Sequence, residues 1–140
     1  MKEISNRLFA GVLLMLAVAA PAAAHHSFIA QFDPDQPIRM TGVLTRIDWT
    51  NPHVYFYIDV KDEETGEVEN WGFEMGPPHM LQARGWKRNS MAIGDVLEVH
   101  ATRARDGSNT ANAREVKFAA TGEVLGAASS EQQTITSGQP

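Results

Sequence analysis

The 140-residue chain contains no cysteine, which excludes disulfide bonds, thiolate metal ligands and a thiol nucleophile. It also lacks an excess of positive charge, because 12 Lys and Arg stand against 17 Asp and Glu, a formal net charge of −5. A chain of this charge is not expected to bind phosphate backbones, so we predict no nucleic-acid partner. Its length suits one domain, and a hydrophobic content of 43% excludes general disorder.

Motifs of the common hydrolases and nucleotide-binding enzymes are absent as well. The sequence has no G-x-S-x-G elbow, no glycine-rich phosphate loop and no H-E-x-x-H helix. Several carboxylates fall in one hydrophilic loop, and only Glu74, beside an aromatic strand, is a candidate general acid or base. Because no nucleophile–base pair can be recognised, we predict that the protein is not an enzyme.

The first 24 residues have the pattern of a secretory signal peptide. Lys2 and Arg7 precede an apolar run over residues 8–20, and three alanines at 22–24 suit signal peptidase. A membrane anchor is the alternative, but the run is shorter than the roughly 20 residues that span a bilayer. We expect cleavage before His25, a periplasmic or secreted location, and no membrane contact afterwards.

The remaining chain divides into three segments. Residues 25–37 are expected to form an N-terminal arm, because Pro34 and Pro37 prevent a long helix. Residues 38–122 hold the folded domain. Residues 123–140 are mostly small and polar, which is typical of a disordered tail.

Alternation of apolar and polar residues predicts five strands in the folded domain. The clearest is 54–61, in which Phe56 and Ile58 point one way and Tyr55 and Tyr57 the other. The others cover about 38–49, 68–75, 96–103 and 113–118, with one short helix at 79–84 before Gly85. This order predicts an all-β fold with one short helix, a small five-stranded OB-like Greek-key barrel. An open β-sandwich is the alternative.

Five short motifs resemble those of one protein family. They are A-H-H-S-F at 24–28, W-T-N-P-H at 49–53, R-G-W at 84–86, G-D at 94–95 and D-G-S-N at 106–109. Together they resemble a family of small exported bacterial proteins that is catalogued as a domain of unknown function. The resemblance covers residues 24–118. It implies export and a small β-barrel, and it transfers no catalytic residue.

The histidine pair at the expected mature N-terminus is the candidate metal site. After cleavage, His25 offers its α-amino group and its imidazole, a nitrogen chelate that a third imidazole completes, as in the histidine brace of copper proteins. Cleavage after Ala23 would place His26 at position three, which also chelates copper. We take His53 and His79 as candidates for the remaining ligands. The competing interpretation is an ordinary signal-peptidase junction, with His53 capping a turn and His79 bonded at a helix start.

Aromatic and basic residues define a second candidate surface. Its residues are Tyr55, Tyr57, Trp86 and Arg88. Such a face on an OB barrel could contact a protein, peptide or glycan. In the competing interpretation the basic residues near Trp86 form a solvated loop, while Trp71 lies in the core and His100 is a solvated surface residue.

Two functions follow from these patterns. The first is an exported periplasmic binding protein, non-enzymatic, that holds copper through its mature N-terminal histidine. The alternative is an OB-like interaction module that docks a protein, peptide or glycan on its aromatic face.

Overall fold

The computed structural model describes residues 28–129, which form a six-stranded sheet curled into a ring. The strands are β1 (Phe32–Asp48), β2 (Tyr55–Lys61), β3 (Val68–Glu74), β4 (Val96–Ala104), β5 (Thr110–Phe118) and β6 (Val124–Gly126), and helix α2 (Pro78–Ala83) lies between β3 and β4. Residues 28–31 are also helical. The predicted signal peptide, His25 and His26, and the end of the predicted tail lie outside the described residues.

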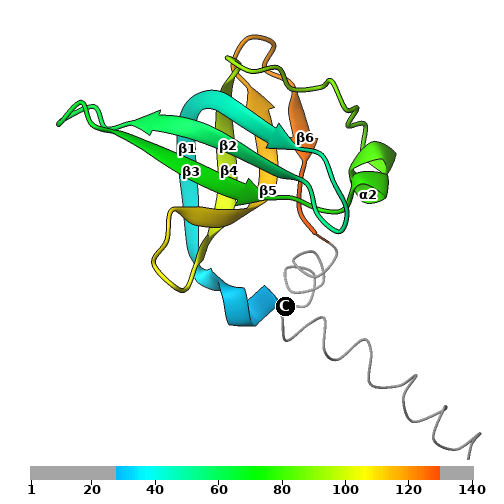
Figure 1. Cartoon of the computed structure of the whole chain (residues 1–140), viewed down its shortest axis with the longest axis horizontal. Coiled ribbons are helices and arrows are strands. Elements are labelled where there is room, and N and C mark those ends of the chain that lie inside the picture. Colours follow the sequence, from blue (N-terminus) through cyan, green and yellow to red (C-terminus); the bar gives the residue numbers. More distant parts are fainter. Residues whose placement is uncertain (1–27, 130–140) are drawn as a thin grey trace, which may run out of the picture.

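The ring closes through a parallel pairing of β3 with β5. The sheet order is β3-β2-β1-β4-β5-β6, and Gly72 pairs with Thr110 and Glu74 with Asn112 across the closure. Strands β1 to β5 therefore form the ring, and β6 pairs with β5 outside it (Figure 1). This strand order, with a helix between the third and fourth strands, is that of the OB fold. The predicted all-β, OB-like fold is confirmed.

Alternate residues of the strands point into the ring and fill it. Phe56 and Ile58 are fully buried, and the Phe56 ring stacks on Phe73 with centroids 5.2 Å apart. Trp71 is 4% exposed, so its predicted place in the core is confirmed. The other large core residues are Leu44, Val54, Met75, Leu81, Trp86, Leu97, Val99 and Val116.

Strand β1 begins at Phe32 rather than at residue 38. Phe32 pairs with Ala104 and Pro37 with Thr102, so the segment predicted as an arm contains the start of a strand. The register shifts between Phe32 and Pro37, and an irregular pairing of this kind tolerates prolines, which have no N–H to donate. Phe32 is anchored by its neighbour Phe28, whose ring centroid lies 5.3 Å away.

Residues 124–129 pack on the ring, where the sequence predicts a disordered tail. Strand β6 pairs with β5, and Ala127 and Ala128 are buried. Their N–H groups donate to the carbonyl oxygen of Arg114 at 2.8 Å and 3.2 Å. Small side chains give little hydrophobic signal in a sequence, yet they let this backbone lie close against the ring.

Helix α2 spans Pro78–Ala83, one residue earlier than the predicted 79–84. Pro78 occupies the first helical turn, and Gly85 follows the C-cap residue Arg84 with φ 96°, a left-handed conformation that suits glycine. Leu81 is the buried residue of the helix. Within residues 28–129, no helix is long and apolar enough to span a membrane.

Candidate functional site

Glu74, the last residue of β3, is a buried carboxylate that three side chains contact. The Tyr55 hydroxyl donates to Oε2 at 2.8 Å. Nδ1 of His53 lies 2.8 Å from Oε1, and Nδ2 of Asn112 donates to the same oxygen at 3.3 Å. Glu74 is only 8% exposed, so these donors replace the water that the carboxylate loses on burial.

Strand pairing brings these residues together from distant parts of the chain. Tyr55 is opposite Glu74 on β2, and Asn112 is opposite Glu74 on β5, so all three share the outer face of the sheet. His53 comes just before β2, in a stretch that backbone hydrogen bonds join to the end of β3, since Met75 N–H donates to the Val54 carbonyl at 2.8 Å. We call His53, Tyr55, Glu74 and Asn112 the Glu74 cluster.

His53 is held in one orientation by Glu74. With the Nδ1 proton donated to the carboxylate, the neutral imidazole keeps the lone pair of Nε2 for another group. The side chain of His53 is 25% exposed, so part of the imidazole is open to solvent. A carboxylate behind an imidazole is the arrangement that orients histidine ligands in metal sites. The partner of His53 is thus a buried acid, not the turn that the competing interpretation assigned to it.

The hydroxyl of Tyr55 is bonded within the Glu74 cluster and does not point to a partner at the surface. Burial, followed by the hydrogen bond to Glu74, raises the pKa of Tyr55 far above its usual value. The phenol therefore remains protonated and continues to donate to the carboxylate at neutral pH. Its hydroxyl is occupied, which limits its use as the partner contact predicted from the sequence.

Asn112 completes the cluster and was not foreseen. Its side chain is fully buried, and its Oδ1 has no hydrogen-bond partner among the described residues. Burying this oxygen without a hydrogen-bond partner costs free energy, and the hydrogen bond from Nδ2 to the buried Glu74 carboxylate offsets that cost. A single polar residue between Ala111 and Ala113 carries no signal in the sequence that would reveal this role.

Tyr57 lies on the same outer face, and Arg46 of β1 covers it. The guanidinium carbon is 3.7 Å from the Tyr57 ring centroid, and the same guanidinium pairs with Asp48 at 3.1 Å. The ring also lies over Gly72, where a Cβ would stand 3.1 Å from the Tyr57 Cε1. Tyr57 is thus on the predicted face, but Arg46, which the sequence did not single out, shares its exposed surface.

Trp86 does not belong to that face, and its assignment there was wrong. It is 2% exposed, its Nε1 donates to the Gly126 carbonyl at 2.8 Å, and its ring centroid lies 5.9 Å from that of Phe118. The segment expected to be disordered covers the indole, which explains the error. Arg88 is exposed in the loop between α2 and β4.

Few groups of the ring are placed to bind a metal together. Within residues 28–129, no three His, Asp or Glu side chains form a group that could hold an ion. Of the predicted ligands, His53 belongs to the Glu74 cluster and His79 is exposed in the first turn of α2. The predicted N-terminal chelate, with His25 and His26, lies outside the described residues.

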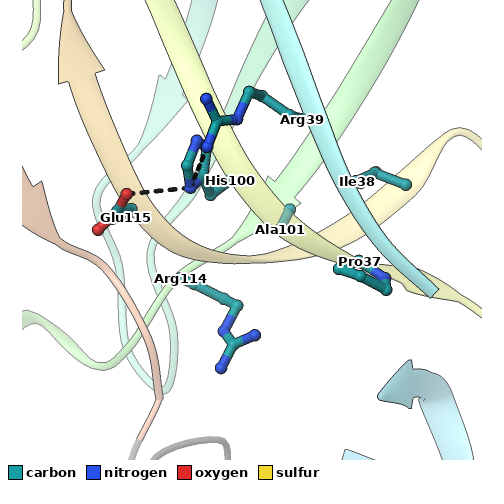
Figure 2. Close-up of a pocket in the computed structure, with 7 residues that line it drawn as sticks. All are labelled: Pro37, Ile38, Arg39, His100, Ala101, Arg114 and Glu115. Atoms are coloured by element: carbon teal, nitrogen blue, oxygen red, sulfur yellow. Dashed lines mark hydrogen bonds and ion pairs between the residues drawn. The ribbon is translucent and has the colours of Figure 1, made fainter. Parts of the chain in front are cut away.

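A pocket of about 420 Å³ opens over β1, β4 and β5 (Figure 2). It is lined by Pro37, Ile38, Arg39, His100, Ala101, Arg114 and Glu115. His100, predicted to be solvated, is instead partly buried there. Its Nδ1 lies 3.0 Å from Glu115, and its Nε2 lies 3.6 Å from Glu98.

The model of a family of unknown function matches residues 12–113 of the chain. The chain belongs to this family, DUF6152. The predicted membership of such a family is confirmed, and the whole Glu74 cluster falls within the matched DUF6152 region. Among curated proteins, none matches the sequence.

The DUF6152 chain is also similar to a solved structure, the mitochondrial single-stranded DNA binding protein Rim1 of S. cerevisiae. The two share 9% sequence identity, with a TM-score of 0.48 over 63% of this chain and 94% of that one. At this identity the likeness concerns the fold.

The exclusion of a nucleic-acid partner is corrected by this finding, because the similar protein is one that binds single-stranded DNA. The exclusion was argued from the net charge of the whole chain, which does not show how the charges are distributed along it. Residues 59–69 contain six of the acidic residues and one basic residue, so the β2–β3 hairpin alone carries the entire charge of −5. Figure 1 shows this hairpin projecting from the ring. The rest of the chain is neutral, and net charge therefore excludes no class of partner.

Proposed function

We propose that the protein is an exported, non-enzymatic binding protein that holds copper(II) at the end of the ring where His53 lies. The observation that carries the proposal is the contact between His53 Nδ1 and the buried carboxylate of Glu74, at 2.8 Å. It leaves Nε2 as the ligand atom and fixes the direction in which the imidazole points. Nitrogen ligands suit Cu(II), which also heads the affinity order of divalent ions.

The role of Glu74 in this proposal is to position, not to react. Both of its oxygens already accept hydrogen bonds, from Tyr55 on one side and from His53 and Asn112 on the other. A carboxylate with both oxygens occupied is a poor general base. This supports a binding function over an enzymatic one.

The remaining ligands in the proposal are the amine and imidazole of His25, with His26 beside them. The chain that follows them is fastened to the β4–β5 turn, because Arg105 donates from Nε to the Ile29 carbonyl at 2.7 Å. The same turn reaches β3, where Gly72 N–H donates to the Asn109 carbonyl at 2.9 Å, two positions before Glu74. His25 precedes Phe28 by three positions along the chain, a reach of at most about 11 Å.

Electron paramagnetic resonance with Cu(II) titration tests the proposal, on protein that begins at His25. We expect one Cu(II) per chain with a spectrum that changes in the His53→Ala variant and on addition of one residue before His25. His79→Ala is the matched control, a histidine exposed on α2, and is expected to leave the spectrum unchanged. A spectrum and affinity equal to those of a free His-His-Ser peptide would show that the fold contributes no ligand.

Export is tested separately from copper. The full chain is expressed in a bacterium with a periplasm, and the intact mass of the recovered protein is measured. We expect a periplasmic form that begins at His25. A cytoplasmic form that retains Met1 would contradict export.

A second candidate function is supported by Tyr57 and Arg46. The stacked pair lies on the outer face of β1 and β2, where an OB-like ring commonly contacts its ligands, and it offers a flat, half-exposed surface for a protein, peptide or glycan. Under this alternative, Arg46→Ala weakens partner capture while Cu(II) binding is unaffected. The two functions are therefore separable by one variant.

A further inference from the structure

Strand β3 has a free edge over its first half. Its pairing with β5 covers only residues 72–74, and within the described part of the chain no other strand pairs with it on that side. Residues 68–70 are exposed and pair with β2 alone. They belong to the hairpin of β2 and β3 that projects from the ring in Figure 1.

Backbone groups on this edge point away from β2. In an antiparallel pair, successive residues direct their N–H and C=O groups to opposite sides of the strand. Gly72 N–H donates to the Asn109 carbonyl at 2.9 Å, on the side of β5. Asn70 and Val68 follow the same alternation, so their N–H and C=O groups point to this side as well. These groups are placed to pair with an added strand.

The carboxylates around the free edge have no basic partner. Residues 59–69 hold six acidic side chains and one basic residue, Lys61. None of the six forms an ion pair with a Lys or Arg of residues 28–129. Glu69 accepts a hydrogen bond from the Trp71 indole at 3.3 Å, but this neutral donor leaves the charge in place. The negative charge of the hairpin is therefore uncompensated.

The two faces of the hairpin offer different side chains to an added strand. Glu67 and Glu69 alternate with Val68, so the two carboxylates lie on one face and the valine lies on the other. Val68 is 59% exposed. An added strand places its own side chains alternately on these faces. Basic side chains on one face would contact the carboxylates, and apolar side chains on the other would contact Val68.

We propose that the free edge of β3 binds an extended, basic segment of another protein, in which Lys or Arg alternates with apolar residues. The segment pairs through its backbone with Val68 and Asn70, as in β-strand addition. Its basic side chains pair with Glu67 and Glu69, which select it from other extended segments. A second copy of this chain is repelled, because it would bring one hairpin of charge −5 against another. The edge is separate from the proposed copper site and from the second candidate surface.

The experiment is a peptide titration of the ¹⁵N-labelled chain, residues 25–140, followed by backbone amide shifts and hydrogen exchange. The probe is a short capped peptide in which lysine and valine alternate. One control has glutamate in place of lysine, which reverses the charge. The other has proline in place of valine, which keeps the charge and removes the N–H groups that would face β3.

We expect the lysine–valine peptide to shift the amides of Val68 and Asn70 saturably. It should also slow their hydrogen exchange at least tenfold, because these N–H groups become bonded. Both control peptides are expected to bind at least tenfold more weakly. Equal binding of the lysine–proline peptide would show ionic attraction without strand addition and would overturn the proposal. Protection of the same amides by self-association, before any peptide is added, would assign the edge to a second copy instead.

Variants separate the backbone contribution from that of the charges. Val68→Pro removes an N–H that points away from β2, so the β2–β3 pairing is kept while peptide binding is expected to weaken at least tenfold. Val68→Thr retains the N–H and is the matched control, expected to bind the peptide. Glu67→Gln combined with Glu69→Gln should weaken binding at least threefold, since exposed ion pairs contribute modestly.

Glu123→Gln removes an exposed carboxylate outside the hairpin and is expected to leave peptide binding unchanged. If Val68→Pro disturbs the hairpin, the combined Glu67→Gln and Glu69→Gln variant still decides the matter. Wild-type affinity for the lysine–valine peptide in that combined variant would contradict the assignment.

Discussion

The imidazole of His53 and the carboxylate of Glu74 contact each other at 2.8 Å, although one precedes β2 and the other ends β3. The contact exists because β2 and β3 pair in a register that puts Tyr55 opposite Glu74. The same register supplies the second donor to the acid, and β5 supplies the third through Asn112. These three side chains hold the buried Glu74 carboxylate in place, and the carboxylate in turn fixes the orientation of each of them.

The hydroxyl of Tyr55 is expected to contribute directly to stability. In Tyr55→Phe the Oε2 of Glu74 loses its donor in a buried position, which should cost about 1–3 kcal/mol of unfolding free energy. Tyr57→Phe is the matched control, because Arg46 stacks on its ring and not on its hydroxyl. Urea unfolding monitored by circular dichroism compares the two. Equal losses in both variants would show that the bond to Glu74 has no special weight.

Stability is expected to fall at alkaline pH because of Tyr55. Burial and Glu74 raise the pKa of Tyr55 in the folded state, while the unfolded chain loses the phenol proton near its ordinary pKa of about 10. The unfolded state therefore binds fewer protons above that pH, and the free energy of unfolding declines as the pH rises further. The free energy of unfolding in urea is measured at pH 8 and at several pH values above 10, which gives the slope of this decline with pH. Tyr55→Phe should show a shallower decline than the wild type.

Gly42 is expected to tolerate no side chain. A Cβ there would stand 2.5 Å from the carbonyl oxygen of Asp59, a backbone atom that cannot rotate away. Gly42→Ala should therefore destabilise the protein by more than about 2 kcal/mol, since backbone must move. Gly126→Ala is the control, because its Cβ would meet only the Arg84 side chain at 3.9 Å. Thermal unfolding of both variants tests the contrast, and similar melting temperatures would contradict it.

Strand β6 and the three residues after it are expected to be part of the folded domain. A chain that ends at Glu123 loses the Gly126 carbonyl that accepts from Trp86, and it uncovers the indole. Relative to a chain that ends at Ser129, we expect a loss of about 3 kcal/mol, from an unpaired buried donor and exposed apolar area. Chemical unfolding with tryptophan fluorescence measures the difference. Comparable stability of the two chains would support a dispensable tail instead.

Much of the ring could be predicted because its strands alternate clearly. Phe56 and Ile58 against Tyr55 and Tyr57 give β2 at once, and Gly85 marks the end of α2. The start of β1 was missed because prolines indicate a break, whereas Pro37 sits where the pairing with β4 is irregular. The last strand was missed because it is only three residues long and small alanines follow it.

The candidate site was predictable only in its members, not in its arrangement. His53 and Glu74 both stand out in the sequence, one in a turn and the other beside an aromatic strand. Their contact depends on strand register, which no local pattern contains. Asn112 is contributed by a parallel pairing between β3 and β5, and Trp86 is covered by residues distant in the chain. Such long-range relationships require the folded structure.

The claim that Glu74 holds His53 ready as a metal ligand is tested most directly by the Cu(II) dissociation constant of Glu74→Gln. The measurement uses competition titration on protein that begins at His25, with His79→Ala as the control. Removing a carboxylate behind a metal-ligating histidine typically weakens binding by roughly 10–100-fold. We predict a loss in that range for Glu74→Gln and none for His79→Ala. Wild-type affinity in Glu74→Gln, in a chain that is still folded, would contradict the account.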